Sequence, residues 1–334
     1  MTDSCDEPIG KGPASASFWS PAAELNACPL FLFSSDELMS ERLVRGFQHH
    51  HWPLRAFSNL AGLGSACSEP TPAIVFLHAR QFSLQSVAVL RDFLADHPAL
   101  HPALLTGPKE LGPAFDLAGH LPNTPVLPAP PWHAFIDHPC WLDWILTPPK
   151  DPLQVYTHMP IRNDILRLHY YEDKEKVWRI QADLLDAMDL GPDQGYDFQL
   201  VFEEILNNAL FHGFRRPDGS HKYRPESIVE LDHHDELWIT IQANPFAYGF
   251  TLTDNGGALP PDVAIHKIGH QLSARGLLEK CGRGLFLAYT LADRMFLQVW
   301  PGAKTQITAI FLHPNVRHAD PLPAKPFFFH LNAP

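Results

Sequence analysis

The most informative stretch of this chain is FEEILNNALFHGF, residues 202–214. Apolar residues recur through it at helical spacing, which predicts an amphipathic helix from about Phe198 to His212. Glu204 and Asn208 are four residues apart and therefore share one helical face. A carboxylate beside a carboxamide suits magnesium-dependent phosphate chemistry, because an amide oxygen binds a hard cation and a carboxylate takes or orients a proton. For this pair alone, a solvated amphipathic helix without a function is the alternative.

Two further segments follow in sequence. A strand-like run, FTLTD, ends at Asp254 and leads into a glycine pair that begins with Gly256. A carboxylate there can accept a hydrogen bond from an exocyclic amine, and glycine lets a flat ring approach the backbone; a plain hairpin turn is the alternative. Residues 281–293, CGRGLFLAYTLAD, then open a helix with Gly282 and Gly284, and this helix is expected to run from about Gly284 to Met295. Backbone amides at such a helix start can bind phosphate oxygens, and an ordinary helix entry is the alternative.

Taken together, the three segments resemble the N, G1 and G2 boxes of the GHKL ATPases, and in particular the anti-sigma-factor serine kinases. EEILNNALFHGF resembles the E-A-x-x-N-A-x-x-H box, TDNGG the D-x-G box, and GRGLFLAYTLAD the glycine-containing box that opens a helix. The resemblance covers roughly residues 160–312. It implies a two-layer α/β sandwich of the GHKL (Bergerat) type that binds ATP with Mg²⁺.

The resemblance also implies roles for individual residues. Glu204 would be the general base, Asn208 would hold Mg²⁺, and Asp254 would bind N6 of adenine. The residues expected around the nucleotide are Gly256, Lys280, Gly282 and Gly284. One departure is Ala258, which stands where the fuller G1 pattern has a second glycine and whose methyl group crowds a backbone approach.

The region between the second and third boxes, about residues 259–280, is the expected lid. It offers cationic or titratable side chains as candidate phosphate contacts: His266, Lys267, His270 and Arg275. A solvated loop explains the same residues and is the alternative.

The amino-terminal half alternates short apolar runs with amphipathic stretches, which predicts a β-α-β-α-β order with a weak extra strand at residues 53–57. The apolar run Ala73–Leu77 suits parallel strands covered on both faces. This order resembles a response-regulator receiver, in which an acidic pair follows the first strand; Asp36 and Glu37 stand there in this sequence. The third strand ends in His78 where that family has its phosphoryl-accepting Asp, so the resemblance implies a pseudo-receiver. An unrelated α/β domain fits the same pattern.

We therefore expect an α/β protein with five parts: a flexible arm at residues 1–24, a receiver-like (flavodoxin-like) domain at 25–130, a Pro-rich linker at 131–155, a histidine-kinase-like ATPase domain at 156–313 and a tail at 314–334. Prolines mark the linker, because each removes a backbone donor and restricts its predecessor. Aromatic side chains within it, namely Trp132, Phe135, Trp141 and Trp144, favour packing of the linker on a domain.

Composition limits the class of protein. The chain has 334 residues and a formal net charge of -12, which opposes a nucleic-acid-binding surface. Its 5 cysteines are scattered without a C-x-x-C pair, which favours a reducing compartment. No apolar run approaches the roughly 20 residues that cross a bilayer. We expect a cytoplasmic protein that binds neither nucleic acid nor membrane.

The resemblance predicts a regulatory kinase in bacterial signalling that transfers the γ-phosphoryl group of Mg-ATP to a Ser or Thr of a partner protein. It implies an anti-anti-sigma-type (STAS) substrate and a sigma factor as a second client, and it leaves a homodimer open. The alternative is a nucleotide-sensing or partner-sequestering module without catalysis. Ala258 favours this alternative, whereas Glu204 opposes it, since binding alone needs no base.

Overall fold

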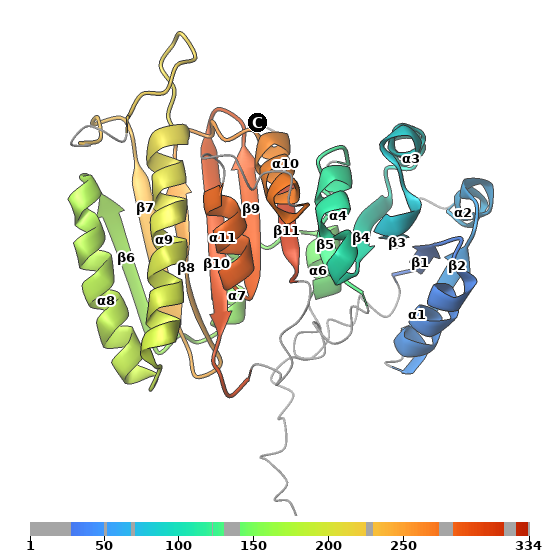
Figure 1. The fold of residues 1–334 in the computed structure, drawn as a ribbon, viewed down its shortest axis with the longest axis horizontal. Helices are drawn as coiled ribbons and strands as arrows, with labels where there is room; N and C mark the ends of the chain where they lie inside the picture. Colours follow the sequence, from blue (N-terminus) through green and yellow to red (C-terminus); the bar gives the residue numbers. More distant parts are fainter. Residues whose placement is uncertain are drawn as a thin grey trace, which may run out of the picture.

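The computed structural model describes residues 28–49, 52–67, 71–121, 123–129, 141–224, 230–273, 283–316 and 325–332. These residues form one sheet of eleven strands in the order β2-β1-β3-β4-β5-β11-β9-β10-β8-β7-β6, with helices against both faces (Figure 1). The chain is therefore a mixed α/β protein, as expected. Among the helices in these ranges, none is both long enough and apolar enough to cross a membrane.

The amino-terminal half contributes five parallel strands: β1 (Leu30–Phe33), β2 (Leu54–Phe57), β3 (Ala73–His78), β4 (Leu100–Thr106) and β5 (Val126–Pro128). Every residue of β3 is buried, as expected for a parallel strand that is covered on both faces. The prediction of parallel strands is confirmed here. The weak strand predicted at residues 53–57 is β2, at one edge of the sheet.

Helices cover both faces of this half: α1 (Glu37–His49), α2 (Leu60–Ala66), α3 (Leu84–Asp96) and α4 (Leu111–Ala118), with short 3-10 turns η2 (Ala79–Gln81) and η3 (Pro108–Glu110) before α3 and α4. Helix α1 buries Leu43 and Phe47 against one face. Helices α2, α3 and α4 bury residues such as Leu63, Leu90 and Phe115 against the other. Alternating strands and helices favour this arrangement, because each apolar strand then gains cover on both sides.

The carboxy-terminal half contributes mostly antiparallel strands: β6 (Arg162–Leu168), β7 (Leu237–Ala243), β8 (Ala247–Asp254), β9 (Arg294–Trp300) and β10 (Lys304–Leu312). Four helices lie against one face: α8 (Lys174–Ala187), which follows the turn η4 (Tyr171–Asp173), α9 (Pro192–His212), α10 (Pro261–Leu272) and α11 (Arg283–Leu291). Helices α6 (Trp141–Leu146) and α7 (Pro152–Tyr156) pack on the opposite face.

Element boundaries differ from the predictions at several points. Helix α9 begins at Pro192, earlier than the expected Phe198, because proline is well suited to the first helical position. Helix α11 ends at Leu291, and Met295, which was expected in this helix, belongs to β9. The sequence also predicts a strand at residues 227–232. Residues 227–229 lie outside the described ranges, and Glu230 forms only an isolated bridge with Tyr170.

The segment expected as a carboxy-terminal tail contains a strand, β11 (Phe327–Leu331), in the middle of the sheet. It pairs in parallel with β9 over five residues and meets β5 at the pair Phe327–Val126. Phe327 and Phe329 are buried on one face of the sheet, and Phe328 is buried on the other. The structure corrects the expected tail for these five residues, because so short an apolar run carries too little periodicity to distinguish a strand from a tail.

Residues 141–155 of the expected linker are described, and they pack on the sheet. Trp144 is 5 % exposed, and its ring contacts the rings of Tyr156, Phe296 and Phe328. The expectation that linker aromatics pack on a domain is confirmed for Trp144. Trp132 and Phe135 lie outside the described residues.

Candidate nucleotide-binding site

Helix α9 carries the first group of predicted site residues. Its apolar side, which includes Val201, Ile205 and Ala209, is buried, and Glu204 and Asn208 are half-buried on another side. Asn208 donates a hydrogen bond from Nδ2 to the backbone oxygen of Glu204, at 2.7 Å. Because its nitrogen is engaged, the amide oxygen of Asn208 is the atom left for a ligand, and oxygen is the donor that Mg²⁺ prefers.

The start of helix α11 packs closely against Glu204 and Asn208. A Cβ atom added to Gly284 would collide with Oε2 of Glu204 and would lie 3.1 Å from Nδ2 of Asn208. Glycine therefore allows α11 to approach α9 closely without displacing either side chain. The structure thus brings together Glu204, Asn208 and Gly284 from two helices that are far apart in the sequence.

Asp254 ends β8 and is only 2 % exposed. Its Oδ1 atom accepts hydrogen bonds from the backbone amides of Gly256 and Gly257, both at 3.0 Å. Burial raises the pKa of this carboxyl to about 6, although the two amide hydrogen bonds oppose the rise. At neutral pH the group is mostly ionised and can accept a hydrogen bond from an amine. Buried carboxyls with raised pKa values are common at functional sites.

The glycines after Asp254 hold the β8 turn against its neighbours. A Cβ atom on Gly256 would collide with the backbone oxygen of Gly213, which follows the last residue of α9. Gly257 has a φ of +56° and accepts a hydrogen bond from the amide of Gly302 at 3.0 Å. Gly256 therefore serves a contact between two backbones, a role that the sequence reasoning did not assign to it.

Gly213 and Glu203 also contribute to the site, although sequence reasoning gave neither a role. A Cβ atom on Gly213 would lie 3.1 Å from Oδ2 of Asp254, so glycine lets the end of α9 reach the buried carboxyl. Glu203 lies 3.5 Å from Nζ of Lys174 in an ion pair. Burial, and then repulsion by Glu203, raises the pKa of Glu204. Only one feature of the sequence indicated these roles, which is that both residues lie in the segment EEILNNALFHGF.

Helix α10 occupies part of the expected lid, and it brings a cation to the end of α9. Three of the predicted contacts lie outside the described residues: Lys280, Gly282 and Arg275. The pKa of His212, in the last turn of α9, is lowered by partial burial and then by electrostatic interactions with His221, Lys267 and Arg215. Lys267 is thus the lid cation that the structure places near α9.

The carboxyl ends of β1, β3 and β4 carry the residues compared with a receiver, where Thr106 stands at the position of that family's usual hydroxyl. Oδ1 of Asp36 accepts a hydrogen bond from the amide of Met39 at 2.9 Å and so stabilises the first turn of α1. His78 is 4 % exposed, and burial lowers its pKa. Thr106 is buried and donates to the backbone oxygen of Gly107 at 3.0 Å. Asp36 therefore has a structural role, and a buried imidazole ends the third strand.

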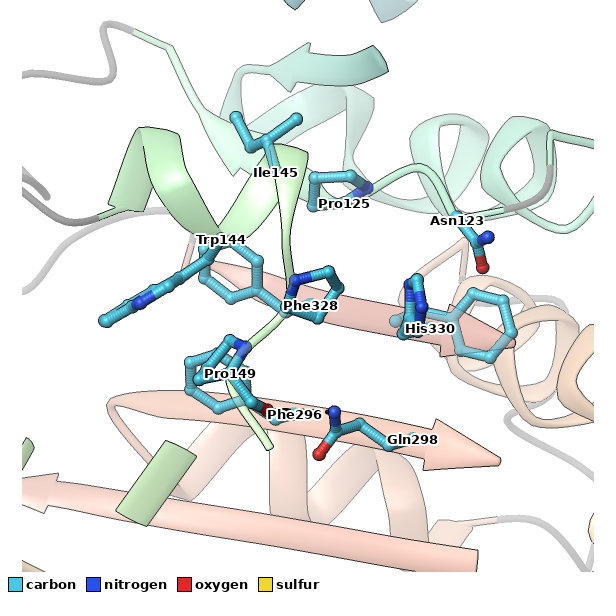
Figure 2. A pocket seen from close by; sticks show the side chains of 11 residues that line it. Asn123, Pro125, Trp144, Ile145, Pro149, Phe296, Gln298, Phe328 and His330 are labelled. Atoms are coloured by element: carbon cyan, nitrogen blue, oxygen red, sulfur yellow. Dashed lines mark hydrogen bonds between the residues drawn. The ribbon is translucent and has the colours of Figure 1, made fainter. Parts of the chain in front are cut away.

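A small pocket lies on the opposite face of the sheet, beside β9, β11 and helix α6 (Figure 2). Trp144, Phe296 and Phe328 line it, and Gln298 donates a hydrogen bond to the backbone oxygen of Pro149 at 3.0 Å. Its interior has room for no more than one water molecule. None of the predicted site residues lines it, so this pocket belongs to the packing between the two halves of the sheet.

Comparison with known proteins gives no family assignment, because no family model and no curated protein matches the chain. Within the described ranges, no three His, Cys, Asp or Glu side chains are grouped so that they could hold a metal ion. The candidate site is therefore defined by the residues that α9, β8 and α11 bring together.

Proposed function

We propose that the carboxy-terminal half is an ATP-binding domain of the GHKL type, resembling anti-sigma-factor serine kinases, that transfers the γ-phosphoryl group to a Ser or Thr of a partner protein. One observation carries the proposal: Glu204, Asn208 and Gly284 meet, and the buried Asp254 lies at the end of the same helix. The three segments that resemble the family boxes are thus neighbours along α9.

The spacing along α9 suits an extended nucleotide. Asp254 meets the helix at Gly213, whereas Glu204 lies nine residues earlier. At a rise of 1.5 Å per residue this separation is about 13 Å. It supports adenine at Asp254 and the γ-phosphate near Glu204, where the backbone amides that open α11 would face the phosphates.

Each proposed residue then has a chemical task. Asn208 would hold Mg²⁺ through its amide oxygen, and the ion would offset the charge of the phosphates. Glu204 would accept the proton of the incoming hydroxyl, and its raised pKa brings it closer to the range in which a base is effective at neutral pH. Asp254 would orient adenine through the exocyclic amine. Lys280 and Gly282 would also lie beside the nucleotide, as the resemblance implies.

The remaining proposals follow from the same resemblance. The partner would be an anti-anti-sigma-type (STAS) protein, with a sigma factor as second client, in the cytoplasm of a bacterium. The amino-terminal half would be a pseudo-receiver, because His78 ends the strand on which a receiver carries its phosphoryl acceptor. It would then act through its contacts and not through phosphorylation of an aspartate.

A second candidate function is a nucleotide-sensing or partner-sequestering module without phosphoryl transfer. Ala258 supports it, because this half-buried residue carries a methyl group where the fuller motif has glycine. Glu204 opposes it, since a module that only binds has no use for a half-buried carboxylate with a raised pKa.

Replacement of Glu204 by Gln separates the two functions. Wild type and Glu204→Gln are incubated with γ-labelled ATP, Mg²⁺ and an arrayed library of Ser and Thr peptides. A kinase should label a subset of peptides, and Glu204→Gln should lower that rate by about 100-fold or more while its affinity for the nucleotide changes little. The matched control, Glu175→Gln at an exposed position of α8, should retain transfer. Equal rates of phosphoryl transfer in wild type and Glu204→Gln would contradict the role of Glu204 as the base. Binding of the nucleotide without phosphoryl transfer to any peptide would favour the nucleotide-sensing or partner-sequestering module.

A further inference from the structure

A hairpin projects from the molecule directly after α9 and carries several cationic side chains. It runs from Phe214 to Tyr223, and an isolated bridge between Arg215 and His221 closes it. In Figure 1 the chain that leaves α9 rises above the ends of the neighbouring strands. We refer to residues 214–223 as the basic hairpin.

The base of the basic hairpin is fixed to the domain. The rings of Phe214 and Tyr223 meet edge to face with centroids 5.7 Å apart, and the amide of Lys222 donates to the backbone oxygen of Phe214 at 3.2 Å. The hydroxyl of Tyr223 donates to Asp235 at 2.5 Å. Nζ of Lys222 lies 2.7 Å from a carboxylate oxygen of Asp232 and of Asp235. These contacts order the base without any ligand.

The arginines of the hairpin have no carboxylate in ion-pair distance among the described residues. Arg215 donates from Nη1 to Nε2 of His221 at 3.1 Å, and Arg216 donates from Nη2 to a backbone oxygen of the same hairpin at 3.2 Å. These bonds hold both guanidinium groups without an ion pair. The charge of Arg216 still acts on Asp218 in the same turn, whose pKa is lowered first by its hydrogen bonds with Ser220 and then by Arg216. The acidic residue of the turn, Asp218, uses its Oδ1 to accept hydrogen bonds from the amide and the hydroxyl of Ser220.

Lys267 extends this charge toward the proposed nucleotide site, at the last turn of α9. The rings of His212 and His221 are 4.9 Å apart, and the charge of Lys267 on α10 acts on His212. His212 lies on α9, eight residues after Glu204. Cations therefore gather beside the proposed site in a chain whose formal net charge is -12. Because like charges repel, an anionic ligand that binds here relieves the repulsion.

We propose that the basic hairpin and Lys267 form a docking site for an acidic segment of the protein that is phosphorylated, an inference that rests on the proposed function. Guanidinium groups pair with carboxylates in a fixed two-pronged geometry, so two adjacent arginines suit Asp or Glu side chains of a peptide. The cluster offers only a few cations, whereas a nucleic-acid backbone is bound through many clustered Lys and Arg side chains, so a short acidic peptide fits it better than a nucleic acid.

The geometry of α9 also sets a spacing for the substrate. From Glu204 to His212 the helix rises by eight residues, which is about 12 Å at 1.5 Å per residue. An extended peptide covers this length in about four residues, at about 3.3 Å each. The preferred substrates should therefore carry Asp or Glu about four residues from the Ser or Thr that accepts the phosphoryl group.

The test measures binding of a fluorescein-labelled peptide to the full-length protein by fluorescence anisotropy, with and without a non-hydrolysable ATP analogue. The peptide carries one Ser with Asp and Glu about four residues away, and a second peptide has Asn and Gln in their place. The acidic peptide should bind about tenfold or more tightly than the neutral one, and added salt should weaken it because salt screens exposed charges. Charge reversal in Arg215→Glu/Arg216→Glu should weaken its binding by at least about tenfold.

Two controls keep the result specific. Arg42→Glu/Arg45→Glu reverses two exposed charges on α1 and should leave peptide binding unchanged. The milder Arg215→Gln/Arg216→Gln variant should give an intermediate loss. No binding of the acidic peptide, equal binding of both peptides, or full binding by the reversed variant overturns the docking site. An equal loss of ATP-analogue affinity in the reversed variant also overturns it, because the cluster then serves the nucleotide. If the wild type binds the acidic peptide but no ATP analogue, the proposed function fails and the docking surface stands.

Discussion

Among the residues of the proposed site, Asp254 is the one whose ionised side chain most clearly destabilises the folded state at neutral pH. Its carboxyl is buried and accepts two amide hydrogen bonds, yet its pKa is raised from 3.8 to about 6. Because the folded pKa lies above the unfolded value, the folded state binds more protons between about pH 4 and 6. Stability is therefore lost as the pH rises through this window. A carboxylate that costs stability at neutral pH is expected where a ligand requires it.

Replacement of Asp254 by Asn should remove this cost. In the absence of nucleotide, the free energy of unfolding of Asp254→Asn should rise relative to wild type as the pH increases from about 4 to 7. The relative gain should reach at most about 3 kcal/mol, at 1.36 kcal/mol per pKa unit. Urea unfolding across this range measures it, with the exposed Asp92→Asn as control. A difference between variant and wild type that does not change with pH contradicts the raised pKa.

The polar residues of the site could be proposed from the sequence because their chemistry is readable from type and spacing. Glu204 and Asn208 had to share a face once α9 was recognised as a helix. The role of Gly256 against Gly213 could not be predicted, because it depends on how closely two backbones separated in sequence approach each other. Burial of Asp254 likewise depends on the packing around the end of β8.

Between elements, glycine decides how closely the β8 turn approaches α9. Gly256→Ala should lower the free energy of unfolding by about 1–3 kcal/mol, because its Cβ would collide with the backbone oxygen of Gly213. It should also weaken nucleotide binding, since the same turn positions Asp254. Urea unfolding and titration with an ATP analogue measure the two effects.

The matched control for this change is Gly219→Ala in the basic hairpin. Gly219 has a φ of +82°, but nothing lies within 4 Å of an added Cβ, so only the backbone cost of about 1 kcal/mol applies. Its affinity for the nucleotide should stay at the wild-type value. An equal loss of nucleotide affinity in both variants would mean that the contact of Gly256 with Gly213 does not support the site.

Strongly patterned elements were predictable, whereas their partners were not. The continuous apolar run of β3 and the stripe of Val177 and Leu184 on α8 identify a buried strand and an amphipathic helix without further information. The strand β11 was missed because its five residues follow a Pro-rich segment and show no period. No pattern within α10 indicates which distant helix covers it.

Among the described residues, strand pairing and helix packing both join the two halves of the chain. Strand β11 lies between β5 and β9 and makes one sheet of all eleven strands. Helix α4 packs on α10 so closely that a Cβ on Gly269 would lie 2.9 Å from Cβ of Phe115, and the ring of Phe115 meets that of Tyr289 on α11 at 5.0 Å. Since α10 and α11 flank the segment with Lys280 and Gly282, the amino-terminal half contacts both helices beside the proposed nucleotide site.

Removal of residues 325–334 should separate the two halves. The truncation takes away three buried phenylalanines and leaves β5 and β9 unpaired on one side, so it should cost several kcal/mol. Differential scanning calorimetry should show one unfolding transition in the full chain and two in the truncated chain. Leu331→Ser, an exposed position of the same strand, is the control and should keep one transition. A single transition in the truncated chain would show that β11 does not join the halves.

The assignment of α9, β8 and α11 to a Mg-ATP site depends on Asn208 and Asp254 acting on the same ligand. Calorimetric titration with a non-hydrolysable ATP analogue, with and without Mg²⁺, tests whether both residues act on this ligand. The full-length wild type is compared with Asn208→Ala, Asp254→Asn and the exposed control Asn163→Ala. We predict binding that Mg²⁺ strengthens in wild type and control, loss of that Mg²⁺ effect in Asn208→Ala, and affinity at least about tenfold weaker in Asp254→Asn. Absence of binding by the wild type, or unchanged binding by both site variants, would contradict the account.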